Sequence, residues 1–133
     1  MLTLRRDTDY AMQVLKFLGK NKRNIASLRD ISESTKISFL FLQKIIRRLR
    51  FAKLVESVQG SQGGYFLTMP LEKITLKQVI EIMEGECAIL DCLRKKTKNE
   101  CVKSGENCSM KNKFKKINKQ FNDILIKTKI SDL

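Results

Sequence analysis

Hydrophobic residues near the start of the chain repeat at the spacing of one helical face. They are Ala11, Val14, Leu15 and Leu18, at i, i+3, i+4 and i+7. This spacing predicts a first helix, and Gly19 marks its end. A second, shorter helix is predicted from Ser27 to about Thr35, because the segment 27–30 has the pattern of a capping box with aspartate in place of glutamate.

A third helix is predicted to begin at Ser38, which caps it after a brief turn at Lys36 and Ile37. Its inner face has helical spacing and consists of Phe39, Leu42, Ile45, Ile46 and Leu49. The segment 38–54 contains no acidic residue, and its basic residues are Lys44, Arg47, Arg48, Arg50 and Lys53. The spacing from the preceding helix therefore predicts a helix-turn-helix whose second helix is strongly cationic.

The segments 54–58 and 65–68 have the composition of two short strands. The six residues between them include three glycines, which predicts a hairpin loop. A helix-turn-helix followed by a hairpin is the order of a winged helix. Beyond Pro70, Thr75 and Gln78 form a capping box that starts a fourth helix, which Gly85 closes. The apolar face of this helix is Leu76, Val79, Ile80 and Met83.

The pattern changes at Glu86. The segment 86–108 contains all four cysteines and no sustained period, which predicts a loop that something other than an apolar core organises. After it, apolar positions alternate in steps of four and three residues with lysines between them, as in a coiled-coil seam. These positions are Met110, Phe114, Ile117, Phe121, Ile124 and Thr128. The predicted fold class is therefore mainly α with a small β-hairpin wing and a long C-terminal helix.

The net charge of the chain indicates which class of partner it binds. The 133 residues include 27 Lys plus Arg against 14 Asp plus Glu, for a formal net charge of +13, and 42% are hydrophobic. This composition is typical of one small folded domain, and the charge favours a polyanionic partner, with nucleic acid first. No apolar run approaches the roughly 18 residues that span a bilayer, and the start lacks a leader pattern. We therefore expect a cytoplasmic protein without a membrane partner.

The four cysteines follow the spacing C-x4-C-x8-C-x6-C. In a reducing compartment such cysteines are more often metal ligands or reactive thiols than disulfides. The spacing is looser than that of structural zinc sites, and the chain has no histidine. Thiolates on a flexible loop suit an iron-sulfur cluster, with zinc as the alternative.

Several short motifs in this chain match one family. They are Thr8-Asp9-Tyr10-Ala11, Asp30-Ile31-Ser32-Glu33, Ile37-Ser38, Leu49-Arg50, Leu54-Val55, Gly63-Gly64-Tyr65 and three late cysteines ahead of a terminal helix. Over nearly its whole length the chain resembles the Rrf-two family of winged-helix transcription regulators. The resemblance implies a homodimer that binds a palindromic operator in double-stranded DNA. Many members sense through an iron-sulfur cluster, and some regulate without one.

By this resemblance the third predicted helix is the recognition helix. We expect Gln43 and Lys44 to read bases, whereas the arginines mainly bind phosphates. The full predicted DNA-binding set is Ser38, Leu40, Gln43, Lys44, Arg47, Arg48, Arg50, Gln59 and Gln62. An ordinary solvated basic face is the alternative for the helix, and for Leu40 and Phe41 a packing role competes with contact to thymine methyl groups.

The predicted wing departs from the family pattern. Gln59 and Gln62 stand where the family commonly has arginine beside the glycines. Glutamine donates hydrogen bonds in a minor groove but gains nothing from its negative potential, so we expect the wing to read DNA shape weakly.

The resemblance also implies the metal ligands. Aligned from the end of the loop, Cys92, Cys101 and Cys108 are the family cysteines, which would hold a two-iron or four-iron cluster. In some members an aspartate of the partner subunit's first helix is the fourth ligand, and Asp9 matches it. A carboxylate in a first helical turn is also favoured by the helix dipole alone. Cys87 is the extra cysteine, either a small hydrophobe or the completion of a four-cysteine site.

These expectations divide the chain into a winged helix-turn-helix DNA-binding domain (1–85), a cluster-binding loop (86–108) and a dimerisation helix (109–133). The alternative for the last helix is packing against its own domain. The predicted function is a transcription regulator, and more specifically a repressor, rather than an enzyme. A cytosolic thiol redox enzyme is disfavoured because the chain has no C-x-x-C pair and no histidine base. A zinc-stabilised RNA-binding protein would need more aromatic platforms than seven Phe and two Tyr offer.

Overall fold

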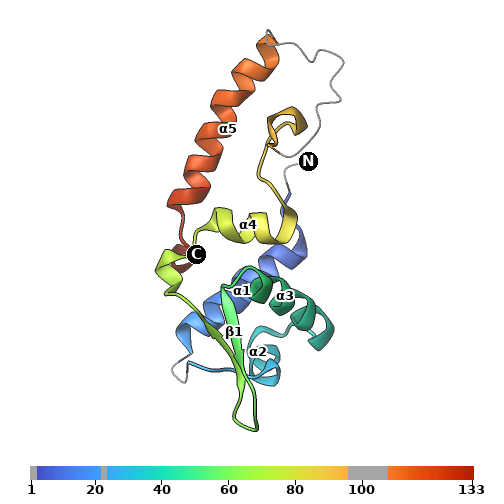
Figure 1. Cartoon of the computed structure of the whole chain (residues 1–133), viewed down its shortest axis with the longest axis vertical. Helices are drawn as coiled ribbons and strands as arrows, with labels where there is room; N and C mark the ends of the chain where they lie inside the picture. Colours follow the sequence, from blue (N-terminus) through green and yellow to red (C-terminus); the bar gives the residue numbers. More distant parts are fainter. Residues whose placement is uncertain (1–2, 22–23, 96–107) are drawn as a thin grey trace.

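The computed structural model describes residues 3–21, 24–95 and 108–133. In the described part, the helices are α1 (Arg6–Lys20), α2 (Leu28–Thr35), α3 (Phe39–Phe51), α4 (Leu76–Glu84) and α5 (Ser109–Lys127). The strands are β1 (Val55–Val58) and β2 (Gly64–Leu67), and short 3-10 turns occur at η1 (Leu71–Lys73), η2 (Asp91–Leu93) and η3 (Ile130–Asp132). This is the mainly helical fold with one antiparallel hairpin that the residue pattern predicts (Figure 1).

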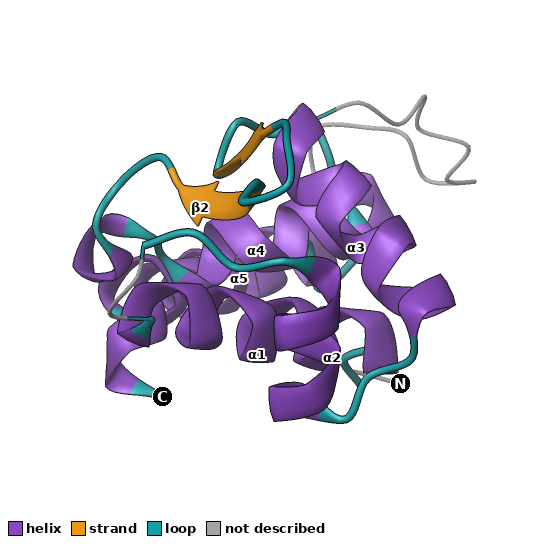
Figure 2. Ribbon diagram, turned by 90° about the horizontal axis from the view of Figure 1, so that it is seen from below, coloured by secondary structure: helices purple, strands orange, loops and turns teal. Residues whose placement is uncertain are grey.

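One apolar core joins α1, α2, α3, α4 and β1. Its members from α1 are the four residues of the predicted face, and those from α3 are Leu42, Ile45, Ile46 and Leu49, all at most 4% exposed. The helices assemble because each brings a stripe at helical spacing to a shared centre. Figure 2 shows α1, α3 and α4 gathered on one side of the hairpin.

The helix-turn-helix forms as predicted, with two corrections at the start of α3. Ser27 caps α2 in a reciprocal capping box with Asp30, and Lys36 (φ 61°) ends α2 in the left-handed conformation. Ser38 precedes α3, but its side chain makes no capping hydrogen bond. Phe39, predicted on the inner face, is 50% exposed, because the first turn of α3 extends beyond the core.

The wing is the antiparallel pair of β1 and β2, in which Val55 faces Leu67 and Val58 faces Gly64. A third segment joins it: Ala26, just before α2, exchanges two backbone hydrogen bonds with Tyr65, of 2.9 and 2.7 Å. A Cβ on Gly64 would lie 2.4 Å from the Ala26 carbonyl oxygen, so this close approach requires glycine. The glycine therefore connects the wing to the helix-turn-helix.

Helix α5 extends away from the winged helix at the end opposite the hairpin (Figure 1). It packs against α4 and η2. The chain then returns, and Ile130 is buried with its N–H bonded to the Ile74 carbonyl oxygen at 3.0 Å. Leu125, which lies outside the predicted seam, is buried, whereas three seam residues are exposed on the described surface: Met110, Ile117 and Ile124.

Candidate nucleic-acid interface and cysteine-bearing loop

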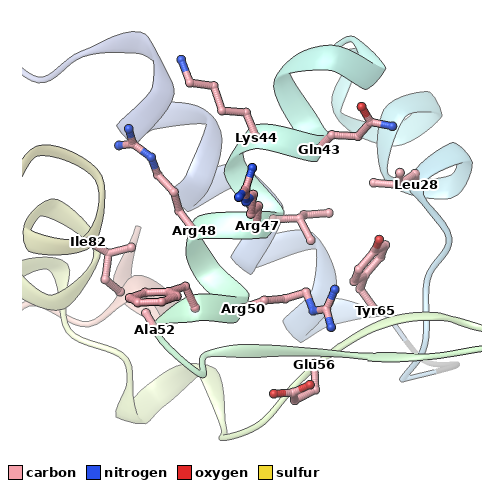
Figure 3. A pocket seen from close by; sticks show the side chains of 12 residues that line it. Leu28, Gln43, Lys44, Arg47, Arg48, Arg50, Ala52, Glu56, Tyr65 and Ile82 are labelled. Atoms are coloured by element: carbon pink, nitrogen blue, oxygen red, sulfur yellow. The ribbon is translucent and has the colours of Figure 1, made fainter.

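The outer face of α3 and the wing enclose an open groove of about 1020 Å³. Its lining includes the predicted DNA-binding residues Gln43, Lys44, Arg47, Arg48 and Arg50, together with Leu28, Glu56, Tyr65 and Ile82 (Figure 3). The capping of α2 and the bridge from Ala26 to Tyr65 position this groove, since they hold α2 and the wing on the same side of α3. The result is a concave, strongly cationic surface.

The three arginines of α3 differ in direction. Figure 3 shows Arg50 extending toward Tyr65 of the wing and Arg48 extending to the opposite side of the helix. The Arg48 Nη1 atom donates to the Met83 carbonyl oxygen of α4 at 2.7 Å. Arg47 and Arg50 are exposed. All three arginines therefore line the groove, and Arg48 also connects α3 with α4.

The first half of α3 presents both polar and apolar groups. Gln43 and Lys44 are exposed, and the Lys44 ammonium lies 3.8 Å from the Asp7 carboxylate of α1. A contact this exposed contributes at most about 1 kcal/mol, so it competes weakly with a phosphate or a base. Leu40 is 81% exposed. The ring of Phe41 packs edge-on against Tyr10 at 5.9 Å, which gives Phe41 a packing role.

The wing tip carries the two predicted glutamines. Gln59 and Gln62 are both exposed at the end of the hairpin, where Gly60 adopts a positive φ of 116° and its carbonyl accepts the Gly63 N–H at 3.0 Å. Both side chains are uncharged. That the wing reads DNA shape only weakly therefore stays a prediction.

The three described cysteines lie at separate points along the chain. Cys87 follows α4, Cys92 lies in η2, and Cys108 precedes the first turn of α5. Among the described residues, no group of three or more His, Cys, Asp or Glu side chains is placed to hold a metal ion. Cys101, the predicted middle ligand, lies outside the described residues, so the predicted ligand set is not assembled in what the structure describes.

Cys108 and Cys87 have different surroundings. The Cys108 Sγ atom accepts the Lys111 N–H at 3.5 Å, the kind of hydrogen bond that supports a ligand thiolate. Burial raises the pKa of the Cys87 thiol, Glu81 raises it further, Lys77 opposes this, and Glu84 and Glu86 also raise it. Because metals bind the thiolate, the donor chemistry fits a soft metal centre better at Cys108 than at Cys87.

Asp9 is exposed in the first turn of α1, and its carboxylate accepts a hydrogen bond from Gln13 at 3.0 Å. The acidic group therefore faces outward from its own chain. Such a position is compatible both with a ligand given to a second subunit and with a simple favourable charge at a helix N-terminus.

Two asparagines of α5 hold the described part of the loop. The Asn118 Oδ1 atom accepts the Ile89 N–H at 2.9 Å, and the Asn122 amide donates to the Cys87 carbonyl oxygen at 3.2 Å. In addition, the Glu86 carboxylate accepts the Lys95 N–H at 2.8 Å. The sequence reading missed these residues, although two asparagines four positions apart inside a helix were a usable signal, because they lie on one face.

One flank of α5 is apolar and exposed. Met110, Ile117 and Ile124 repeat every seven residues and are 59%, 48% and 61% exposed. Side chains at this spacing lie in one row along a helix. Among the helices of the described ranges, none combines the length and the apolar character that crossing a bilayer requires. Within the described chain, the row is exposed to solvent.

Comparison with known proteins agrees with this arrangement. Residues 4–133 match the Rrf2 (Rrf-two) family, which is described as an iron-dependent transcriptional regulator. The transcriptional regulator NsrR of Oceanobacillus iheyensis is 32% identical over 133 residues, which cover 99% of this chain and 89% of that protein. NsrR of Bacillus licheniformis is 32% identical over 127 residues, covering 95% and 87% of the two chains.

Solved structures share the fold. CymR, the global cysteine regulator of B. subtilis, has a TM-score of 0.75 at 22% identity and covers 99% of this chain and 95% of its own. IscR of T. potens has a TM-score of 0.73 at 26% identity and covers 98% and 85%. Regulators of this family bind DNA and are commonly dimers. The family match spans nearly the whole chain, and both the winged helix and the cationic groove agree with it. The chain is therefore a transcriptional regulator of the Rrf2 family.

Proposed function

We propose that this chain is a cytoplasmic, homodimeric repressor whose affinity for a palindromic DNA operator is controlled by an iron-sulfur cluster. The observation that carries the proposal is the groove beside the wing, on which α3 presents four cationic side chains. In the proposed complex, α3 lies in the major groove, Gln43 and Lys44 read bases, and Arg47 and Arg50 bind phosphates. Ser38 and Leu40 reach the duplex at the start of α3.

The metal centre of the proposal uses Cys92, Cys101 and Cys108, with Asp9 of the partner subunit as the fourth ligand. The sulfur-rich donor set and the N–H that Cys108 accepts from Lys111 support it, because soft thiolates with such hydrogen bonds suit iron-sulfur clusters. When bound, a cluster supplies a centre whose charge and integrity respond to oxidants, nitric oxide or iron supply. The chain's own residues would hold it beside α5 and face Asp9 toward a second copy.

The dimer of the proposal forms through the apolar row of α5. Three aliphatic side chains at seven-residue spacing match a seam between two helices, and a second copy supplies an identical row. Two recognition helices would then face half-sites spaced by one or two turns of DNA, at roughly 34 Å per turn.

The metal centre is tested on protein expressed and purified without oxygen. We expect a coloured protein that contains iron and sulfide in equal amounts, and we expect Cys92→Ser and Cys108→Ser to lose the colour. Asp9→Ala should shift the visible spectrum. Cys87→Ala is the matched control and should keep the spectrum, because Cys87 is outside the proposed ligand set.

A colourless protein that contains zinc, or no metal, would reject the cluster and favour the second candidate, a zinc or thiol regulator of the same fold. The observation behind this candidate is the set of four soft thiols, which suit zinc as well as iron. An unchanged spectrum for Asp9→Ala would remove only Asp9 from the ligand set.

The DNA partner is tested by selection from a random duplex library and titration of the selected duplex. We expect a palindromic site, and we expect the logarithm of the binding constant to fall linearly with the logarithm of salt concentration. RNA of the same sequence at the same salt concentration is the comparison. Equal affinity for both nucleic acids would contradict the proposed operator recognition.

A further inference from the structure

The last turn of α4 is a junction of three helices. The Met83 carbonyl oxygen accepts the guanidinium groups of both Arg48, from α3, and Arg5, which precedes α1. The next side chain, the Glu84 carboxylate, accepts the Arg5 N–H at 2.8 Å and the Thr8 hydroxyl at 2.5 Å. Two consecutive residues of α4 therefore bind the recognition helix and the start of α1 together.

These bonds follow from the chemistry of helix ends. The last carbonyl groups of a helix have no partner within it and carry partial negative charge, so they accept cationic donors well. The N–H groups at the start of α1 lack acceptors within the helix, and the Glu84 carboxylate accepts the one of Arg5. Thr8 is completely buried, and its hydroxyl finds its acceptor here. The junction thus satisfies polar groups that the core would otherwise leave unpaired.

The junction also stands at the start of the cysteine-bearing loop. Directly after Glu84, Gly85 turns the chain with a φ of 94°, and Cys87 follows two residues later. On the far side, Arg48 lines the groove of α3 together with Arg47. A change in the path of the loop that shifts the last turn of α4 must therefore either move α3 or break the bond from Arg48.

We propose that Arg48 is a positioning residue: its hydrogen bond to the Met83 carbonyl oxygen transmits the state of the cysteine-bearing loop to the recognition helix. This inference rests on the proposed function and replaces the phosphate contact expected for Arg48. In thermodynamic form, the bond is part of the coupling between the metal centre and DNA, which changes the affinity of one for the other reciprocally. Arg48 touches neither the DNA nor the metal in this role.

The test is the ratio of two DNA affinities, measured for protein isolated without oxygen and for the same protein after iron removal by a chelator. Both are titrated with the duplex selected by the wild-type chain, at one salt concentration. Arg48→Met keeps the aliphatic stem of the side chain and removes every donor. We expect it to bring the ratio to within about twofold of one, where a free-energy difference is negligible. Its iron content and visible spectrum should equal those of the wild type.

Arg50→Met is the matched control, since it removes the same charge from the other side of α3. We expect it to weaken both forms by the same factor, to keep the ratio, and to lower the salt slope by about one. Arg48→Lys should recover part of the ratio, because an ammonium can still donate to the carbonyl. Glu84→Ala, at an exposed position, breaks the other half of the junction and should also reduce the ratio.

Each further outcome has a defined reading. If Arg48→Met weakens both forms equally and lowers the salt slope, Arg48 is a phosphate contact and the inference is wrong. If Arg48→Met and Glu84→Ala both keep the wild-type ratio, the junction does not couple the loop to DNA. A wild-type protein with a ratio of one, or without iron, overturns the proposed function itself, which is a different result from a wild-type ratio that the variants preserve.

Discussion

The winged helix and the region after α4 are built in opposite ways. In the winged helix, α1 and α3 bury continuous apolar faces in one core, and capping boxes stabilise the N-termini of α2 and α4. After α4, only Leu125 and Ile130 are buried among the described residues, and the polar bonds of Asn118 and Asn122 hold the loop to α5. One apolar core thus organises the first region, whereas polar hydrogen bonds and two buried side chains organise the second and leave its apolar row exposed.

The largest expected effect concerns the core. Leu15→Ala removes a side chain that is fully buried, and we expect the free energy of unfolding to fall by about 2 to 5 kcal/mol. Ile126→Ala, on the partly exposed α5 and outside the apolar row, should change it by no more than about 0.5 kcal/mol. Urea unfolding followed by circular dichroism measures both. Equal losses would show that α5 is as much a part of the core as α1.

The second effect breaks the dimer proposed for α5. Ile117→Glu places a charge in the apolar row, and we expect a folded monomer whose affinity for the selected palindrome falls by about 100-fold, because the second half-site no longer adds to binding. Light scattering and a DNA titration measure the two results. Lys119→Glu puts the same side chain on the opposite flank, beside Cys87, and should remain a dimer. A dimeric Ile117→Glu protein would assign the apolar row to some other contact.

The third effect separates the groove from the wing. Arg47→Ala removes an exposed cation of α3, and we expect affinity for the selected duplex to fall by roughly 10-fold and the salt slope to fall by about one. Gel-shift titrations at several salt concentrations provide both numbers. If Arg47→Ala loses less affinity than the wing variant Gln59→Ala, the assignment of DNA recognition to α3 is wrong.

The smallest effect lies at the wing tip. Gln59→Ala should lower affinity by less than about threefold, since an uncharged side chain gains little from the potential of a narrow minor groove. Gln59→Arg is the sharper variant, and we expect it to bind A·T-rich flanking sequence more tightly than the wild type does. The same titrations on duplexes that differ only in the flanks measure the effect. If Gln59→Arg brings no gain in affinity for the A·T-rich flanks, the wing does not reach the minor groove of the DNA.

The residue pattern was sufficient to predict the elements that depend on interactions between residues near in sequence. The faces of α1 and α4, the caps at Ser27 and Thr75 and the position of the hairpin follow from spacing and turn chemistry, and the structure confirms them. Local rules failed at the edges of the core. Phe39 has helical spacing with Leu42, yet it is half exposed, because spacing states which side chains share a face and not where the neighbouring helices stop.

The site shows the same division. Basic residues, thiols and the cationic segment can be identified without a structure, since these are properties of single side chains in local order. The packing of the helices selects the partners: Arg48 donates to the Met83 carbonyl of α4, Thr8 donates to Glu84, and Asn122 donates to the Cys87 carbonyl. Such contacts join positions 35 to 76 residues apart, and the geometry that selects one acceptor over another arises when the helices pack.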